Sequence, residues 1–194
     1  TNNAHKLTEV QAVLGDAYEL VTPRMCGVEE EIPENQPTLE GNASEKSHYL
    51  RARTGLDCFA DDTGLEVEAL DGAPGVHSAR YGPKGHDGTD DERIAFLLEN
   101  MKEVPEAART AKFVCVITCL WPDGREIVAR GECPGRILYE KHGAGGFGYD
   151  PVFFVPELRK TFAQLTPEEK NAISHRGNAL RAFGAELKEY LEKH

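Results

Sequence analysis

The sequence predicts an α/β fold in which helices flank a β-sheet. Two observations carry this prediction. Short apolar or alternating segments, typical of strands, are interleaved along the chain with segments whose apolar residues recur at helical spacing. The chain of 194 residues is also long enough for one domain with a substantial core. No repeat or linker interrupts it, so we expect a single domain over residues 1–194.

The first part of the chain predicts two helices. Leu7, Val10 and Leu14 fall on one helical face, and Gly15 ends the pattern. The patch over residues 28–37 is rich in Pro and Glu and is expected to form a loop. A second helix is expected from about Leu39 to Arg53.

Two strands are expected around a pair of adjacent acids. The segment Leu56–Ala60 is short and apolar, and Leu65–Leu70 alternates between apolar and acidic residues. Asp61 and Asp62 stand between them, and Gly64 is expected to turn the chain. The acids would then lie at the end of an apolar strand.

The rest of the chain alternates strands and helices. Residues 71–84 are rich in Gly and Pro and predict a loop, and Thr89 followed by Glu92 is a capping box for a helix. Thr166 with Pro167 predicts the start of another short helix. Expected strands are Phe113–Trp121, Glu126–Gly131 after the turn at 122–124, and Pro151–Val155. A last helix is expected from near Ser174, with an apolar stripe of Leu180, Phe183, Leu187 and Leu191.

Composition bounds the class of protein. The net charge of −11 argues against general affinity for nucleic acid, which demands a basic surface. Five scattered cysteines without a CxxC pair are typical of reduced core residues in a cytoplasmic protein. No apolar run approaches the roughly 18 residues of a membrane span, and no secretory signal pattern is present.

The first chemically suggestive stretch is "TNNAHK" at the start of the chain. Thr1, Asn3 and Lys6 lie just before and inside a predicted helix start. Helix N-termini offer free backbone N–H groups and a positive dipole end, which favour phosphate. The alternative is an ordinary helix cap beside a solvated lysine.

The second stretch is Asp61-Asp62-Thr63-Gly64. Two acids at a strand end could hold Mg²⁺, which prefers carboxylate oxygens and shares substrate phosphates. A carboxylate nearby could also accept a proton from water. The alternative is an acidic turn that caps backbone donors.

Two later stretches offer groups suited to a base. In "GAGGFGYDP", Phe147 and Tyr149 have flat faces for stacking and Asp150 offers an acceptor. In "EKNAISHRG", Lys170 and the pair His175-Arg176 place basic donors in an acidic chain. Each could equally be structural, as a glycine-rich turn with core aromatics or as a helix junction with solvated charges.

Together the four stretches supply groups for phosphate, metal, base stacking and base reading, which indicates nucleoside triphosphate chemistry. No GxxxxGK[ST] motif is present, so the chain is not a P-loop protein. The four stretches closely resemble, in order, the motifs of the inosine triphosphate pyrophosphatase family. The quoted matches are "TNNAHK", "ADDTGLEVEALDGAPGVHSARYG", "GFGYDPVFF" and "TFAQLTPEEKNAISHRG", and the resemblance covers nearly the whole chain.

The resemblance implies an elongated mixed β-sheet with flanking helices and two lobes around a central cleft. It implies a Mg²⁺-dependent enzyme that removes ITP, dITP and XTP from the nucleotide pool, with water as nucleophile and with the monophosphate and pyrophosphate as products. It also implies a cytoplasmic homodimer. Hypoxanthine and xanthine carry an acceptor at position 6, where adenine carries a donor, so a donor such as Arg176 would select them.

The resemblance also implies roles for particular residues. Asp62 would be the general base, and Glu34, Asp62 and Asp61 would hold the metal. Substrate would be bound by Thr1, Asn3, Lys6, Lys46, Thr63, Arg80, Phe147, Gly148, Tyr149, Asp150, Lys170, His175 and Arg176.

Two departures from the family pattern stand out. Family members usually carry a short apolar strand before the first motif, whereas this sequence starts at Thr1, so we expect that strand to be lacking here. Gly41 also stands where many members have an acid.

Three other functions stay open at this point. A pyrophosphatase for modified pyrimidine nucleotides would share the fold. A non-catalytic nucleotide-binding module would need the basic and aromatic residues without the acids. An acidic scaffold protein would show no nucleotide affinity.

Overall fold

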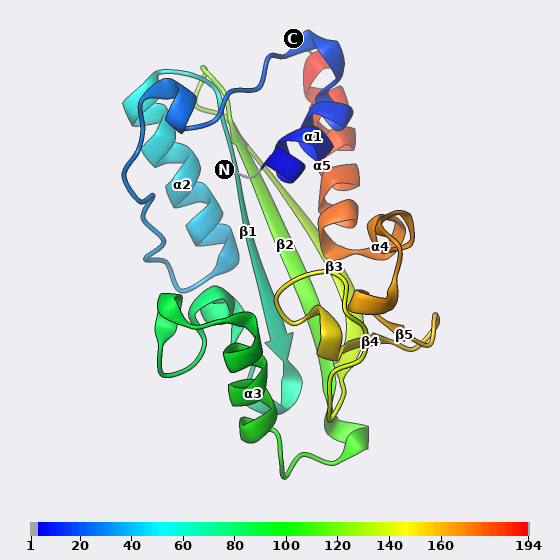
Figure 1. Cartoon of the computed structure of the whole chain (residues 1–194). Coiled ribbons are helices and arrows are strands. Elements are labelled where there is room, and N and C mark those ends of the chain that lie inside the picture. Colours follow the sequence, from blue (N-terminus) through cyan, green and yellow to red (C-terminus); the bar gives the residue numbers. More distant parts are fainter. Residues whose placement is uncertain (1–3, 194) are drawn as a thin grey trace. The chain divides into compact units, whose positions relative to one another are not determined.

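The computed structural model describes residues 4–193 and divides into two compact units. The first unit contains residues 1–62, 115–131 and 177–194, and the second contains residues 63–114 and 132–176. Three long strands contribute to both: β1 (Cys58–Val67), β2 (Thr110–Leu120) and β3 (Glu126–Ile137) (Figure 1).

The sheet has five strands in the order β1-β2-β3-β4-β5. The short strand β4 (Phe153–Val155) pairs antiparallel with β3, with Ile137 opposite Phe153. It also pairs antiparallel with β5 (Lys160–Thr161). The expected α/β class is confirmed, but the strand pairs whose register is described are antiparallel, where a mixed sheet was expected.

In the first unit, helices cover β2 on both faces (Figure 1). The helices α1 (Ala4–Leu14) and α5 (His175–Glu192) pack on β2 and β3 through a core that includes Val10, Ile117 and Phe183. Helix α2 (Leu39–Thr54) lies on the other side, where the Thr118 hydroxyl of β2 donates to the Ala43 carbonyl at 3.0 Å. Coverage of both faces explains why β2 is almost entirely buried.

In the second unit, the core lies between the sheet, α3 (Asp90–Asn100) and the segment that follows β3. Helix α3 begins with the expected capping box, in which Thr89 and Glu92 accept each other's backbone N–H. Helix α4 (Pro167–Ile173) begins with the same motif, formed by Thr166 and Glu169. Both sequence signals for helix starts are therefore confirmed.

The expectation of two strands separated by a turn at Gly64 was wrong. Residues Cys58–Val67 form one continuous strand, β1, and Asp61 and Asp62 lie in its middle. A glycine inside a strand pattern need not turn the chain, and here the pairing of β1 with β2 in the sheet carries the strand through. The acids therefore sit on a strand rather than on a flexible turn.

Within residues 4–193, no helix has the length and apolar character needed to cross a membrane.

Candidate functional site

Glu34, Lys46 and Asp62 form a compact charged group in the first unit. The Lys46 ammonium lies 2.5 Å from Glu34 Oε1 and 3.2 Å from Asp62 Oδ1. It also donates to the backbone carbonyl of Asp61 at 2.9 Å. Three elements supply this group: the loop before α2, α2 itself and β1.

The electrostatics of this group follow from its burial. Burial raises the pKa of Asp62, and the Lys46 charge partly offsets that rise. Burial alone would lower the pKa of Lys46, but the carboxylates of Asp62 and Glu34 outweigh it and raise that pKa. Lys46 is therefore a firmly protonated counter-ion for two carboxylates.

Asp61 does not join the same group. Its Oδ2 lies 2.7 Å from the Lys6 ammonium on α1, whereas Asp62 pairs with Lys46 on α2. Successive side chains of a strand point to opposite faces of the sheet, which explains the separation. The predicted ligands Asp61 and Asp62 are thus directed to different lysines.

Two carboxylates of this group could hold a metal ion. Among the described residues, no three His, Cys, Asp or Glu side chains converge closely enough to hold a metal ion. However, Glu34 and Asp62 present hard carboxylate oxygens, and Asp62 Oδ2 is buried without a hydrogen-bond partner. The chemistry of these two carboxylates fits a divalent cation such as Mg²⁺, which takes few protein ligands.

Thr1 and Asn3 lie outside the described residues. Thr63 follows Asp62 in β1, and its hydroxyl is buried without a hydrogen-bond partner. A buried orphan hydroxyl is uncommon and is consistent with a group that meets a ligand.

A second group of predicted residues gathers in the second unit around Phe147. The Phe147 ring is 63% exposed. The Lys170 ammonium lies 4.8 Å from the ring centroid, and the Arg176 guanidinium lies 6.0 Å from it. A flat exposed ring with two cations beside it can stack on a nucleobase and donate hydrogen bonds to it.

The buried Asp150 carboxylate holds two members of this group in place. Its side chain is buried, and its Oδ2 accepts from the Lys170 ammonium at 2.6 Å and from the Phe147 N–H at 3.1 Å. Burial raises the pKa of Asp150, and the Lys170 charge opposes the rise. The carboxylate therefore fixes both the loop and the lysine.

Two predicted base-contacting residues are buried in the core instead. Tyr149 is 5% exposed, and its hydroxyl donates to the Ser78 carbonyl at 2.7 Å. The His175 ring is 7% exposed and stacks on Phe113 at 4.7 Å between centroids. Tyr149 thus presents no open face for stacking, and of the two predicted aromatic faces only that of Phe147 is exposed.

The remaining predicted residues also lie in the second unit. Arg80 ends a 3₁₀ helix over 75–80, and its Nε donates to His77 Nδ1 at 3.3 Å. Gly148 adopts a left-handed backbone with φ of 58°, and its N–H donates to Asp90 at 2.8 Å.

Sequence reasoning missed two residues of the second group. A Cβ added to Gly146 would lie 2.1 Å from Asp150 Oδ2, so only glycine fits there. Asp90 was not among the predicted site residues, although its carboxylate accepts the Gly148 N–H. The crowding of four glycines between residues 143 and 148 was a signal for the first, but no local signal pointed to the second.

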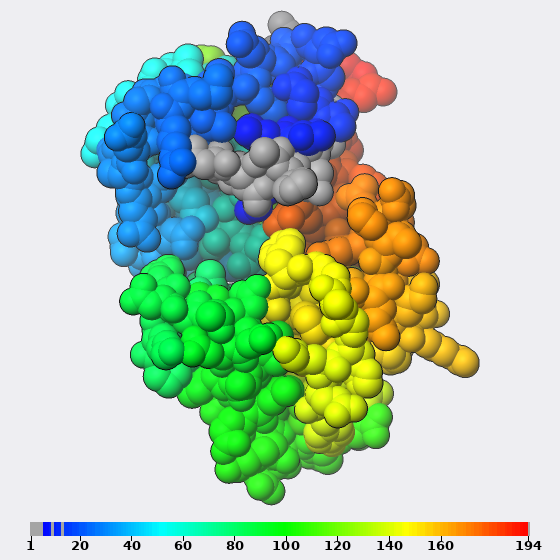
Figure 2. Space-filling view, in the orientation of Figure 1, coloured from blue at the N-terminus to red at the C-terminus, as the bar shows by residue number. Residues whose placement is uncertain are grey.

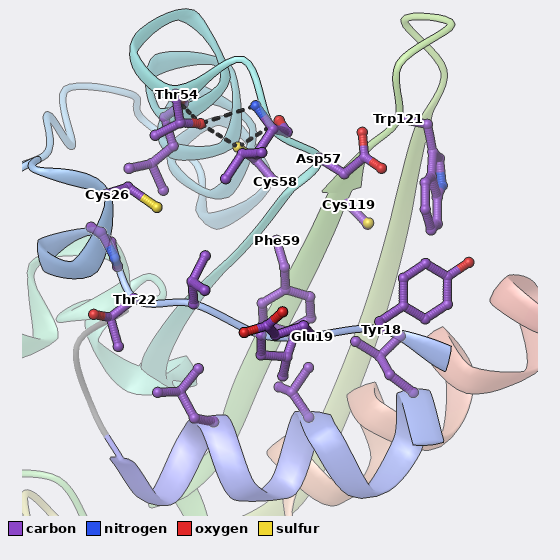
Figure 3. A pocket seen from close by; sticks show the side chains of 18 of the residues that line it. Tyr18, Glu19, Thr22, Cys26, Thr54, Asp57, Cys58, Phe59, Cys119 and Trp121 are labelled. Carbon is purple, nitrogen blue, oxygen red and sulfur yellow. Dashed lines mark hydrogen bonds between the residues drawn. The ribbon is translucent and has the colours of Figure 1, made fainter. Parts of the chain in front are cut away.

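An apolar cavity lies elsewhere in the first unit. It has a volume of about 270 Å³. Figure 3 shows Tyr18, Phe59 and Trp121 around it, together with Cys58 and Cys119. None of the predicted site residues lines it. Burial raises the pKa of Cys119 to about 12, so that thiol stays protonated.

Comparison with known proteins supports the resemblance. The Ham1 family model matches residues 1–186. A dITP/XTP pyrophosphatase from Clostridium perfringens is 42% identical, over 99% of this chain and 97% of that protein. Another, from Porphyromonas gingivalis, is 46% identical over 98% of this chain and 94% of that protein.

A solved structure agrees with the fold. The structure of a HAM1 protein from Coxiella burnetii superposes with a TM-score of 0.91 and 40% identity, covering 97% of this chain and 96% of that one. The family resemblance predicted from the four motifs is confirmed, and the chain belongs to the Ham1 family.

Proposed function

We propose that this chain hydrolyses deaminated purine nucleoside triphosphates, such as dITP, ITP and XTP, to the monophosphate and pyrophosphate. One observation carries the proposal: relatives named dITP/XTP pyrophosphatase are 42–46% identical over nearly the whole chain. The two groups of charged and aromatic residues support it, because they supply the chemistry that such a substrate needs.

The carboxylate and lysine group of the first unit suits the triphosphate. Glu34 and Asp62 would hold Mg²⁺, which neutralises phosphate charge and lowers the pKa of water near it. Lys46 and Lys6 would add positive charge for the phosphate oxygens. Thr1, Asn3 and Arg80 stay predicted phosphate contacts, and Thr63 stays a predicted substrate contact.

Asp62 is the proposed general base. Its carboxylate is largely buried, and its Oδ1 pairs with Lys46. Its Oδ2 makes no close hydrogen bond, although the nearby Asn42 amide lowers the pKa of the carboxyl, and Oδ2 is the oxygen that would accept a proton from the attacking water. Burial raises the pKa of Asp62, which makes it a stronger base than an exposed aspartate. The Lys46 charge opposes that rise.

The group around Phe147 suits the base. The exposed ring would stack on the purine, and Arg176 and Lys170 would donate to the acceptor at position 6. Arg176 Nε is buried and has no hydrogen-bond partner, so a donor awaits an acceptor there. An adenine amino group would leave that donor unpaired, which disfavours ATP and dATP.

The proposal is tested by measuring products from dITP, dATP, dGTP and dUTP, with and without Mg²⁺. We expect pyrophosphate and dIMP from dITP when Mg²⁺ is present, and much slower turnover of the other three nucleotides. Release of inorganic phosphate instead of pyrophosphate would contradict the reaction. Faster turnover of dUTP than of dITP would favour the pyrimidine alternative, and binding of dITP without hydrolysis would favour a binding module.

A further inference from the structure

Two adjacent acids of helix α3 contact the segment that carries Phe147. The Gly148 N–H donates to Asp90 Oδ2 at 2.8 Å, and the Lys141 ammonium lies 2.8 Å from Asp91 Oδ1. Figure 2 shows the green segment that includes α3 beside the yellow segment that includes this loop, both at the surface. The loop is therefore tied to a helix far from it in sequence.

The Asp90 carboxylate is itself held in place. Its Oδ1 lies 3.2 Å from the guanidinium of Arg93, whose side chain is only 13% exposed. Arg93 also donates to the His86 carbonyl at 3.2 Å. The Asp90 side chain is half exposed, and its pair with the largely buried Arg93 restrains it.

Two carboxylates therefore accept hydrogen bonds from the backbone around Phe147. Asp150 accepts the N–H of Phe147, and Asp90 accepts the N–H of the next residue, Gly148. Two successive amides held in this way fix the direction of the intervening backbone. Because Phe147 is 63% exposed, core packing does little to position its side chain, and these hydrogen bonds hold the backbone that carries it.

We infer that Asp90 is a positioning residue for base recognition, acting through the Gly148 amide to set the Phe147 ring beside Lys170 and Arg176. This inference rests on the proposed function, since it assigns the base to Phe147. Asp90 touches neither base nor phosphate in this role. Asp91 contributes less to holding this segment, because the side chains of its pair are exposed, 77% for Asp91 and 47% for Lys141. Exposed ion pairs stabilise little.

The test compares four variants for dITP hydrolysis with Mg²⁺. Asp90→Ala removes the acceptor, and Asp90→Asn keeps an oxygen that can accept the Gly148 N–H. Asp91→Ala and Glu99→Ala are matched controls on the same helix. Glu99 pairs with the nearby Lys102. One hydrogen bond to a charged group predicts a KM increase of roughly five- to tenfold for Asp90→Ala, with kcat within about twofold.

We expect Asp90→Asn to restore most of the KM, and the two controls to stay within about twofold of the unchanged protein. A second measurement is independent of activity: hydrogen exchange at the Gly148 amide should accelerate in Asp90→Ala and not in Glu99→Ala. An unchanged KM in Asp90→Ala would overturn the inference, and so would unchanged Gly148 exchange. So would an equal loss in Asp90→Asn.

Different results would contradict the proposed function and the inferred role of Asp90. If the unchanged protein does not hydrolyse dITP, the proposed function falls. The exchange measurement then still decides whether Asp90 holds the loop, because it needs no substrate. A Gly148 amide that exchanges freely in the unchanged protein would overturn the inference whatever the enzyme does.

Discussion

Replacing Lys170 by Met should destabilise the second unit, because it removes the cation that pairs with the buried Asp150 carboxylate. The pair is 2.6 Å long, with side-chain exposures of 22% for Lys170 and 4% for Asp150. Removing one partner of a buried pair costs about 3–5 kcal/mol. Since Lys170 is partly solvated, we expect a loss of about 2 kcal/mol, or about 4–8 °C in Tm.

The loss should depend on pH, and its sign can be worked out. Burial raises the pKa of Asp150 and Lys170 opposes it, so Lys170→Met should raise that pKa further. An acid whose pKa is higher in the folded than in the unfolded state loses stability as pH rises through the folded pKa. The deficit of the variant should therefore be largest near neutral pH and shrink as the solution is acidified.

The assay is urea unfolding at pH 7 and pH 5, with two further variants. Lys160→Met is the matched control, because its pair with Glu169 is exposed and should cost no more than about 0.5 kcal/mol. The double variant Lys170→Met with Asp150→Asn removes both charges and should recover part of the loss. The reasoning is refuted if Lys170→Met is as stable as the control at pH 7, or if the double variant is less stable than the single one.

Three further predictions concern single residues of the second unit. Arg109 is 1% exposed, and its guanidinium donates to the backbone carbonyls of Met101, Val104, Ile137 and Leu138. Arg109→Leu should therefore lower the free energy of unfolding by about 3 kcal/mol. A loss below about 1 kcal/mol would contradict this. Phe147→Leu keeps an apolar side chain but removes the flat face, so the KM for dITP should rise about tenfold with normal Tm, and an unchanged KM would exclude stacking. Gly146→Ala should raise the KM as well, because its Cβ would displace Asp150, and a normal KM would show that the loop adapts.

Most helix boundaries were predictable because their signals are local. Capping boxes at Thr89 and Thr166 are satisfied by atoms three residues away, so the sequence alone contains both partners. Helix α2 ends at Gly55 in the left-handed conformation, one residue after its last helical residue, as a terminal glycine allows.

Strand boundaries were less predictable because they depend on distant partners. The strand β3 continues to Ile137, six residues beyond the expected end at Gly131, where pairing with β4 holds its last residues. The acids Asp61 and Asp62 were expected at a strand end for the same reason: nothing near Gly64 reveals that β1 continues beside β2.

The candidate site was predicted by residue type but not by exposure. Motif matching named Tyr149 and His175 with Phe147, although the first two are buried and only Phe147 is exposed. Side-chain burial depends on which core each ring meets, such as Phe113 beside His175, and that partner lies 62 residues earlier in the chain. The Lys46 bridge between Glu34 and Asp62 was hidden for the same reason.

The most direct test of the account is the rate of Mg²⁺-dependent pyrophosphate release from dITP by Asp62→Asn. Asp57→Asn is the matched control, because Asp57 is an exposed acid of the same unit that pairs with Arg51. We predict that Asp62→Asn slows kcat by about 10²–10⁴, and that Asp57→Asn stays within about twofold of the unchanged protein. Turnover by Asp62→Asn close to that of the unchanged protein would contradict the role of Asp62 as general base.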